Sequence, residues 1–154
     1  MTQSQTFHGP LRVGEDGRYL VDARGEPFFW MGDTAWPLYA QYTPDDAEAY
    51  LANRAARGFT VIQGVLAWGH GTGMENPEPV ANHAGERPWR RGPDEPNDAY
   101  FRNVDHLLDV AERHGLVLAM LPTWGYYVNN IGTFNPENAR VYGRWLGERY
   151  RERP

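Results

Sequence analysis

Side chains suited to sugar recognition lie near the ends of three apolar segments of this chain. The segments are residues 27–36, 59–68 and 116–125. The side chains are Asp33, Trp36, Gln63, Trp68, Thr123 and Trp124. Indole rings stack on flat apolar surfaces such as the faces of sugar rings, and carboxylates and amides exchange hydrogen bonds with hydroxyl groups. Whether they act together depends on the fold.

Asp33 is the best-placed acid, because most other acids lie at expected helix starts, in turns or on exposed faces. Its carboxylate could accept a hydrogen bond from a substrate hydroxyl. Alternatively, it could cap the following turn through backbone N–H groups or pair with an arginine. A catalytic role would need a second carboxyl group nearby, since glycoside hydrolysis uses two.

The amide and the aromatic residues also allow a structural explanation. Gln63 interrupts an apolar run, and a buried amide needs hydrogen-bond partners. These partners could be ligand hydroxyls or a neighbouring strand-end residue such as Asp33. A single strand-end tryptophan more often packs in the core, but three at successive segment ends make a shared stacking surface an equal alternative. Tyr126 follows the third segment and is expected at the rim of the same site.

Residues 11–31 are predicted to form an antiparallel hairpin prelude. Short apolar segments flank the turns "GEDG" and "ARGE", and each turn has a glycine that can adopt a positive φ angle. The run from Phe28 to Met31 is continuously apolar, which predicts a strand covered on both faces.

Each of the three apolar segments is followed, along the chain, by a segment of helical character. Thr43, Asn97 and Asn135 are the expected N-caps, although Asp98 is an alternative start for the second helix. Gly58 ends the first helix by the same rules. Strand–helix alternation predicts a parallel sheet, whose ligands bind at the carboxyl ends of the strands. The side chains named above would then surround one site.

Composition removes several kinds of chemistry. The chain has no cysteine, and all 15 of its basic residues other than histidine are arginine. Thiol nucleophiles, disulfides and Schiff-base lysines are therefore excluded. The only serine is Ser4, in the polar leader, which argues against a serine hydrolase. No cofactor is expected.

Charge and hydropathy set further expectations. A net charge of −5 argues against a nucleic-acid or anionic-membrane partner. Residues 1–10 are expected to be a disordered leader without the apolar stretch of a signal peptide, and no apolar run is long enough to span a membrane. The chain as written is therefore expected to be cytoplasmic.

Residues 69–96 form a long insert rich in glycine and proline, and loops of this length are usually binding loops or lids. His70, Glu75 and His83 have no recognised metal-ligand spacing, so no metal is expected. Arg90 and Arg91 could contact an acidic sugar, but a solvated charged loop is the simpler explanation.

Four motifs together resemble one family. "FFWMGDTAW", "RGFTVIQGVLAW", "LPTWG" and "FNPENARVYGRWLGERY" are similar, in this order, to the apiosidase-like glycoside hydrolases. The resemblance implies an α/β fold, a (β/α)8 TIM barrel, and a carbohydrate substrate in polysaccharide side chains. It implies no role for a particular residue, because the catalytic carboxylates of the family are expected on later strands.

A (β/α)8 barrel needs about 250 residues, whereas this chain supplies about three βα units after the prelude. Residues 11–154 are therefore expected to be the amino-terminal part of the barrel, with rim residues but no catalytic pair. The alternatives are a non-catalytic carbohydrate-binding αβ module and an inactive gene fragment. We also expect self-association through unpaired sheet edges.

Overall fold

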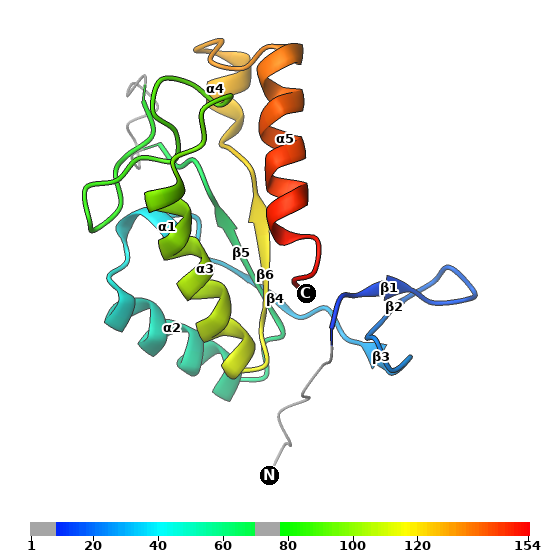
Figure 1. Cartoon of the computed structure of the whole chain (residues 1–154). Helices are drawn as coiled ribbons and strands as arrows, with labels where there is room; N and C mark the ends of the chain where they lie inside the picture. Colours follow the sequence, from blue (N-terminus) through cyan, green and yellow to red (C-terminus); the bar gives the residue numbers. More distant parts are fainter. Residues whose placement is uncertain (1–8, 70–77) are drawn as a thin grey trace.

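The structure is a computed structural model that describes residues 9–69 and 78–154. The expected leader therefore falls almost entirely outside the described residues. Two three-stranded sheets are present, one antiparallel and one parallel, with five helices in the described part of the chain. Figure 1 shows the antiparallel sheet beside the lower end of the parallel strands.

The hairpin prelude is confirmed. Its antiparallel sheet has the order β1-β2-β3, and its strands are Arg12–Val13, Leu20–Val21 and Pro27–Phe28. Gly17 and Gly25 adopt φ angles of 72° and 88° in the two connecting turns, where a residue with a Cβ atom would be strained.

The prediction of a strand covered on both faces over residues 28–31 is wrong. Phe28 alone is buried, in β3, while Phe29, Trp30 and Met31 are 63%, 53% and 44% exposed. The chain leaves the antiparallel sheet after Phe28 and joins the parallel sheet only at Gly32. Three apolar residues therefore lie in the connection between the two sheets, where no strand of the described residues covers them.

The parallel sheet is confirmed, with the order β4-β5-β6. Its strands are Gly32–Thr34, Val61–Val65 and Val117–Leu121. Asp33 is opposite Ile62, which is opposite Leu118, and Thr34 is opposite Gln63, which is opposite Ala119. Because neighbouring residues of a strand point to opposite faces, these two rows lie on different faces of the sheet.

The three predicted helices are confirmed. They are α2 (Pro44–Ala56), α3 (Asp98–Arg113) and α5 (Pro136–Tyr150). Thr43, Asn97 and Asn135 are their N-caps, and each side chain accepts a hydrogen bond from a backbone N–H of the first turn. Two short helices that were not predicted follow β4 and β6. They are α1 (Leu38–Gln41) and α4 (Gly125–Asn129).

The two faces of the parallel sheet are covered differently. Ile62 and Leu118 belong to a large buried cluster with residues of α1, α2, α3 and α5, which makes this the helix face. Val61 and Val117 pack on Phe28 of β3 in a small second cluster that contains no helix residue. We call this second side, which also carries Thr34, Gln63 and Ala119, the hairpin face.

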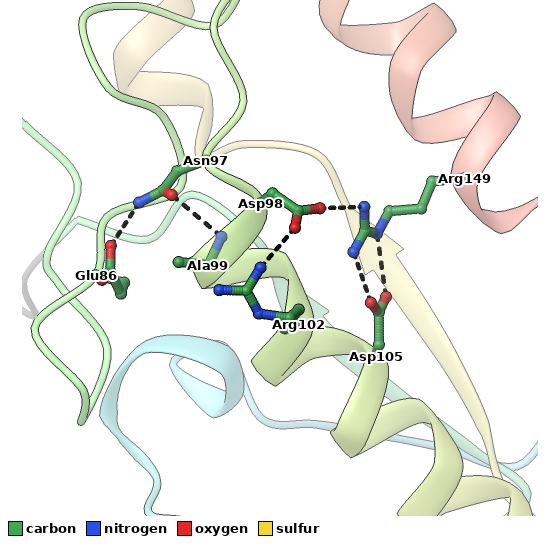
Figure 2. A network of polar contacts seen from close by, with 7 residues as sticks. All are labelled: Glu86, Asn97, Asp98, Ala99, Arg102, Asp105 and Arg149. Atoms are coloured by element: carbon green, nitrogen blue, oxygen red, sulfur yellow. Dashed lines mark hydrogen bonds and ion pairs between the residues drawn. The ribbon is translucent and has the colours of Figure 1, made fainter.

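A polar network joins α5 to α3 beside the core (Figure 2). The guanidinium of Arg149 donates to both carboxylate oxygens of Asp105, at 2.6 and 3.2 Å, and to Asp98 at 2.8 Å. The hydrogen bond from Arg149 holds the pKa of Asp98 below its usual range. At the start of α3, Asn97 also donates to Glu86 of the insert, at 2.7 Å. The network fixes α3 and α5 behind the helix face and ties the insert to them.

No helix within the described ranges is long and apolar enough to cross a membrane.

Candidate functional site

The three strand-end tryptophans meet in the structure. Trp36 follows β4, Trp68 follows β5 and Trp124 follows β6. The ring centroids of Trp36 and Trp124 are 5.9 Å apart, and those of Trp68 and Trp124 are 4.9 Å apart. Both pairs are edge-on, the arrangement that aromatic quadrupoles favour. We call these three residues the tryptophan cluster.

Backbone hydrogen bonds hold the cluster in place. The N–H of Val65 donates to the carbonyl of Trp36 at 3.0 Å, and the N–H of Trp124 donates to the carbonyl of Ala67 at 3.3 Å. The sheet ladder thus continues past the ends of the strands. All three indoles remain partly exposed, unlike the fully buried aromatic residues of the core. The cluster is therefore a partly exposed aromatic surface whose backbone is held by the sheet.

Gln63 lies on the hairpin face, between Thr34 of β4 and Ala119 of β6. Its side chain is half-buried, and its amide has no hydrogen-bond partner among residues 9–69 and 78–154. An amide in such a position keeps one acceptor and two donor hydrogens for a ligand or for water. Thr34 is exposed beside it.

The Asp33 side chain lies on the helix face, the opposite face of the sheet from Gln63. Its Oδ2 accepts hydrogen bonds from the Tyr50 hydroxyl at 3.0 Å and from Nη1 of Arg54 at 3.1 Å, both on α2. Its Oδ1 accepts from the backbone N–H of Thr34 at 2.8 Å. Burial, and secondarily the hydrogen bond to Asp33, raise the pKa of Tyr50 above its ordinary value. The carboxylate therefore joins β4 to α2.

The structure thus contains both structural alternatives considered for Asp33, a contact to a following backbone N–H and an ion pair with an arginine. It does not bring the Asp33 carboxylate to Gln63, because the two lie on opposite faces of the sheet. Thr34 shares the hairpin face with Gln63 instead, and it was not among the predicted site residues. The period-two alternation of a strand predicts this position, because residues 32 and 34 lie on the opposite face of the strand from residue 33.

Replacing Asp33 by asparagine should lower stability rather than ligand affinity. The change leaves the Arg54 guanidinium, which is 30% exposed, without its anionic partner. We expect a loss of about 1–3 kcal/mol in the free energy of unfolding, between the values for exposed and buried ion pairs. Urea unfolding measures it, with the exposed Asp45→Asn as the control. Unchanged stability with a tenfold loss of glycan affinity would contradict the structural role.

Tyr126 and Tyr127 lie on α4, directly after Trp124. Tyr126 is partly exposed, with its ring centroid 6.1 Å from that of Tyr127. Tyr127 is buried edge-on against Trp89, and burial raises the pKa of its hydroxyl to about 12. Tyr126 is therefore the more exposed tyrosine of this pair.

The described part of the insert, residues 78–96, is partly integrated into the core. Trp89 is buried against Tyr127, Phe134 and Tyr142. Arg91 is exposed and pairs with Glu95, as expected of a solvated loop. His70 and Glu75 lie outside the described residues, and His83 is exposed. No group of three or more potential metal ligands occurs in the part of the chain that the structure describes.

These observations define an α/β protein with an aromatic surface at the carboxyl ends of its parallel strands. The sequence model of the family "Apiosidase-like, catalytic domain" matches residues 14–154. The chain therefore belongs to the apiosidase-like family. No curated protein matches it closely enough to count as a relative.

Solved structures agree with this assignment. A "Glycoside hydrolase" has a TM-score of 0.79 and 33% sequence identity, with 95% of this chain and 32% of that chain covered. A glycoside hydrolase family 5 protein from Bacteroides vulgatus ATCC 8482 also has a TM-score of 0.79, with 29% identity over 94% of this chain and 30% of that chain. A family 5 mannosidase from Rhizomucor miehei is 15% identical, with a TM-score of 0.56, and shows the fold alone. The chain spans about a third of the length of the first two relatives.

Proposed function

We propose that the chain forms part of the glycan-binding surface of a glycoside hydrolase domain built as a (β/α)8 barrel. The tryptophan cluster stacks on sugar rings, Gln63 exchanges hydrogen bonds with sugar hydroxyls, and Tyr126 lines the rim. Asp33, which we expected to bind substrate, instead holds the end of β4 against α2. Side chains of polysaccharides are the proposed substrate class, on the strength of the family resemblance.

One observation carries the proposal. Three partly exposed tryptophans from three different strand ends are in contact through Trp124. They lie at the carboxyl ends of the parallel strands, where α/β barrels bind ligands. Trp89, which packs in the core of the same chain, is only 7% exposed, whereas the three residues of the tryptophan cluster are partly exposed. The Gln63 amide, which has no hydrogen-bond partner among the described residues, lies on the face of the sheet opposite the helices and adds a polar contact.

The catalytic carboxylates are not supplied by these strands. Asp33 is the only acid in residues 32–36, 61–69 and 117–125, and both its oxygens are bound within the fold. Glycoside hydrolysis requires two carboxyl groups flanking the scissile bond. The 154-residue chain by itself should therefore bind glycans without cleaving them.

Isothermal titration calorimetry against a panel of plant-type oligosaccharides tests the proposal. We expect heat with at least one branched oligosaccharide and no turnover of chromogenic glycosides. No heat with any glycan, in a sample shown to be folded by circular dichroism, would refute glycan binding and favour an inactive fragment. Robust turnover that is lost in Asp33→Asn would show that the catalytic pair lies within this chain.

A further inference from the structure

The described part of the insert contacts the tryptophan cluster through its backbone. The N–H of Val80 donates to the carbonyl of Trp68 at 3.0 Å. The ring centroid of Trp68 is in turn 4.9 Å from that of Trp124. Figure 1 shows the insert (green) at the upper end of the parallel strands, beside α4. The position of one of the three tryptophans therefore depends on how the insert is held.

Arg87 holds this contact from within the insert. Its Nη1 donates a hydrogen bond to the carbonyl of Pro79, the residue directly before Val80, and lies 3.7 Å from a carboxylate oxygen of Glu78. Because Arg87 and Pro79 are eight residues apart, the hydrogen bond crosses the loop between them. A hydrogen bond from a charged donor is stronger than one between neutral groups. The Arg87 side chain therefore fixes the segment that carries the Val80 N–H.

The backbone of Arg87 is itself fixed to the start of α3. Its carbonyl accepts a hydrogen bond from Nδ2 of Asn97 at 3.0 Å. The same amide donates to Glu86 at 2.7 Å (Figure 2). Asn97 is only 9% exposed and is the N-cap of α3. The arginine therefore reaches across the loop from a backbone that the helix start holds in place.

Tyr127 supports the chain at Trp68 from a second side. A Cβ atom added to Gly69, the residue after Trp68, would lie 3.0 Å from the Tyr127 hydroxyl oxygen. Tyr127 is fully buried, and its ring centroid is 6.3 Å from that of Trp89 in the insert. Burial raises the pKa of Tyr127, and the nearby charge of Arg87 acts in the opposite direction. Arg87 and Tyr127 therefore lie close together beside the chain that carries Trp68.

We propose that Arg87 is a positioning residue for glycan binding, which acts through the Pro79 carbonyl and the Val80 N–H to hold Trp68 against Trp124. The inference rests on the proposed function, because it concerns the same aromatic surface. Arg87 does not touch the sugar in this role. Its removal leaves the Pro79 carbonyl without a charged donor and frees the segment that holds Trp68.

A double-mutant cycle between Arg87→Ala and Trp68→Ala tests the proposal, by calorimetry with the best ligand of the oligosaccharide panel. We expect Arg87→Ala to weaken binding about fivefold in the unmodified chain and less than about 1.5-fold in the Trp68→Ala chain. A residue that acts through another has no separate effect once the second is removed. Equal losses in both backgrounds would mean that Arg87 contacts the glycan itself, and would overturn the positioning role. No loss in either background would overturn it as well.

Arg12→Ala is the matched control. Arg12 is exposed on the hairpin and also donates to a backbone carbonyl, that of Ala23, at 3.1 Å. The variant therefore removes the same charge and the same kind of hydrogen bond at the other end of the parallel strands (Figure 1). We expect its glycan affinity to stay within about twofold of the unmodified chain, because distant sites act independently. A loss equal to that of Arg87→Ala would attribute the effect to net charge and refute the proposal.

Circular dichroism of the unliganded chain tests the positioning separately from glycan binding. Two indoles in contact give an exciton couplet that depends on their distance and mutual orientation, so the Trp68–Trp124 pair can be observed without a sugar. We expect Arg87→Ala to shift the couplet most of the way to the signal of Trp68→Ala, and Arg12→Ala to leave it unchanged. If no glycan binds, the proposed function is refuted, but a shifted couplet still supports the role of Arg87 in holding Trp68. An unchanged couplet in Arg87→Ala refutes that role.

Discussion

Trp124→Ala is expected to weaken oligosaccharide binding about five- to thirtyfold, which corresponds to a loss of about 1–2 kcal/mol. Trp124 is the central ring of the tryptophan cluster, since it contacts both Trp36 and Trp68. Its removal deletes one stacking surface and frees the two remaining indoles to change orientation. Calorimetry with the best ligand of the oligosaccharide panel measures the effect.

The control for this experiment is Trp30→Ala. Trp30 is also partly exposed, but it lies over Gly32 at the opposite end of β4 from Trp36. We expect its replacement to change glycan affinity by less than about twofold, because a distant site contributes independently. Equal losses for the two variants would mean that binding follows tryptophan content or stability rather than the cluster. A thermal melt of each variant separates those two causes.

The main elements of the fold could be predicted because local signals agreed with one another. Thr43 and Asn135 are each followed by proline, which suits the first turn of a helix, and both are N-caps in the structure. The apolar runs around Ile62 and Leu118 are long enough to be recognised as buried strands. The short helices α1 and α4 carry no such signal: neither has a side-chain cap, and each has five residues or fewer.

The prediction of a buried strand over residues 28–31 was wrong for a non-local reason. Apolar periodicity reports which residues tend to be covered, and it assumes that the covering chain is present. Phe29, Trp30 and Met31 have the composition of a buried strand, yet they lie exposed between the two sheets.

The candidate site could be predicted in position but not in every orientation. Strand–helix alternation alone places the three tryptophans at one end of the sheet, and the ring contacts agree with it. The direction of Asp33 depends on the register of a three-residue strand, in which a shift of one residue exchanges the two faces. Its partners Tyr50 and Arg54 come from α2, seventeen and twenty-one residues further along the chain.

Phe101→Ala is expected to lower the free energy of unfolding by about 3–5 kcal/mol, the usual cost of truncating a buried phenylalanine. Phe101 is fully buried on α3 and lies edge-on to Tyr142 and Trp145 of α5, with centroids 6.4 and 4.5 Å away. The ring therefore joins the two helices behind the sheet. Urea unfolding followed by tryptophan fluorescence measures the change.

Phe29→Ala is the matched control, because the same side chain is removed from a position that is 63% exposed. We expect a change within about 0.5 kcal/mol, as for most surface substitutions. A difference of this size between the two phenylalanines would mean that packing on the helix face stabilises the chain, whereas the exposed residues 29–31 contribute little to its stability. If the two variants lose equal stability, the Phe29 ring packs as closely in solution as the buried Phe101 ring, and the contrast between the two positions is wrong.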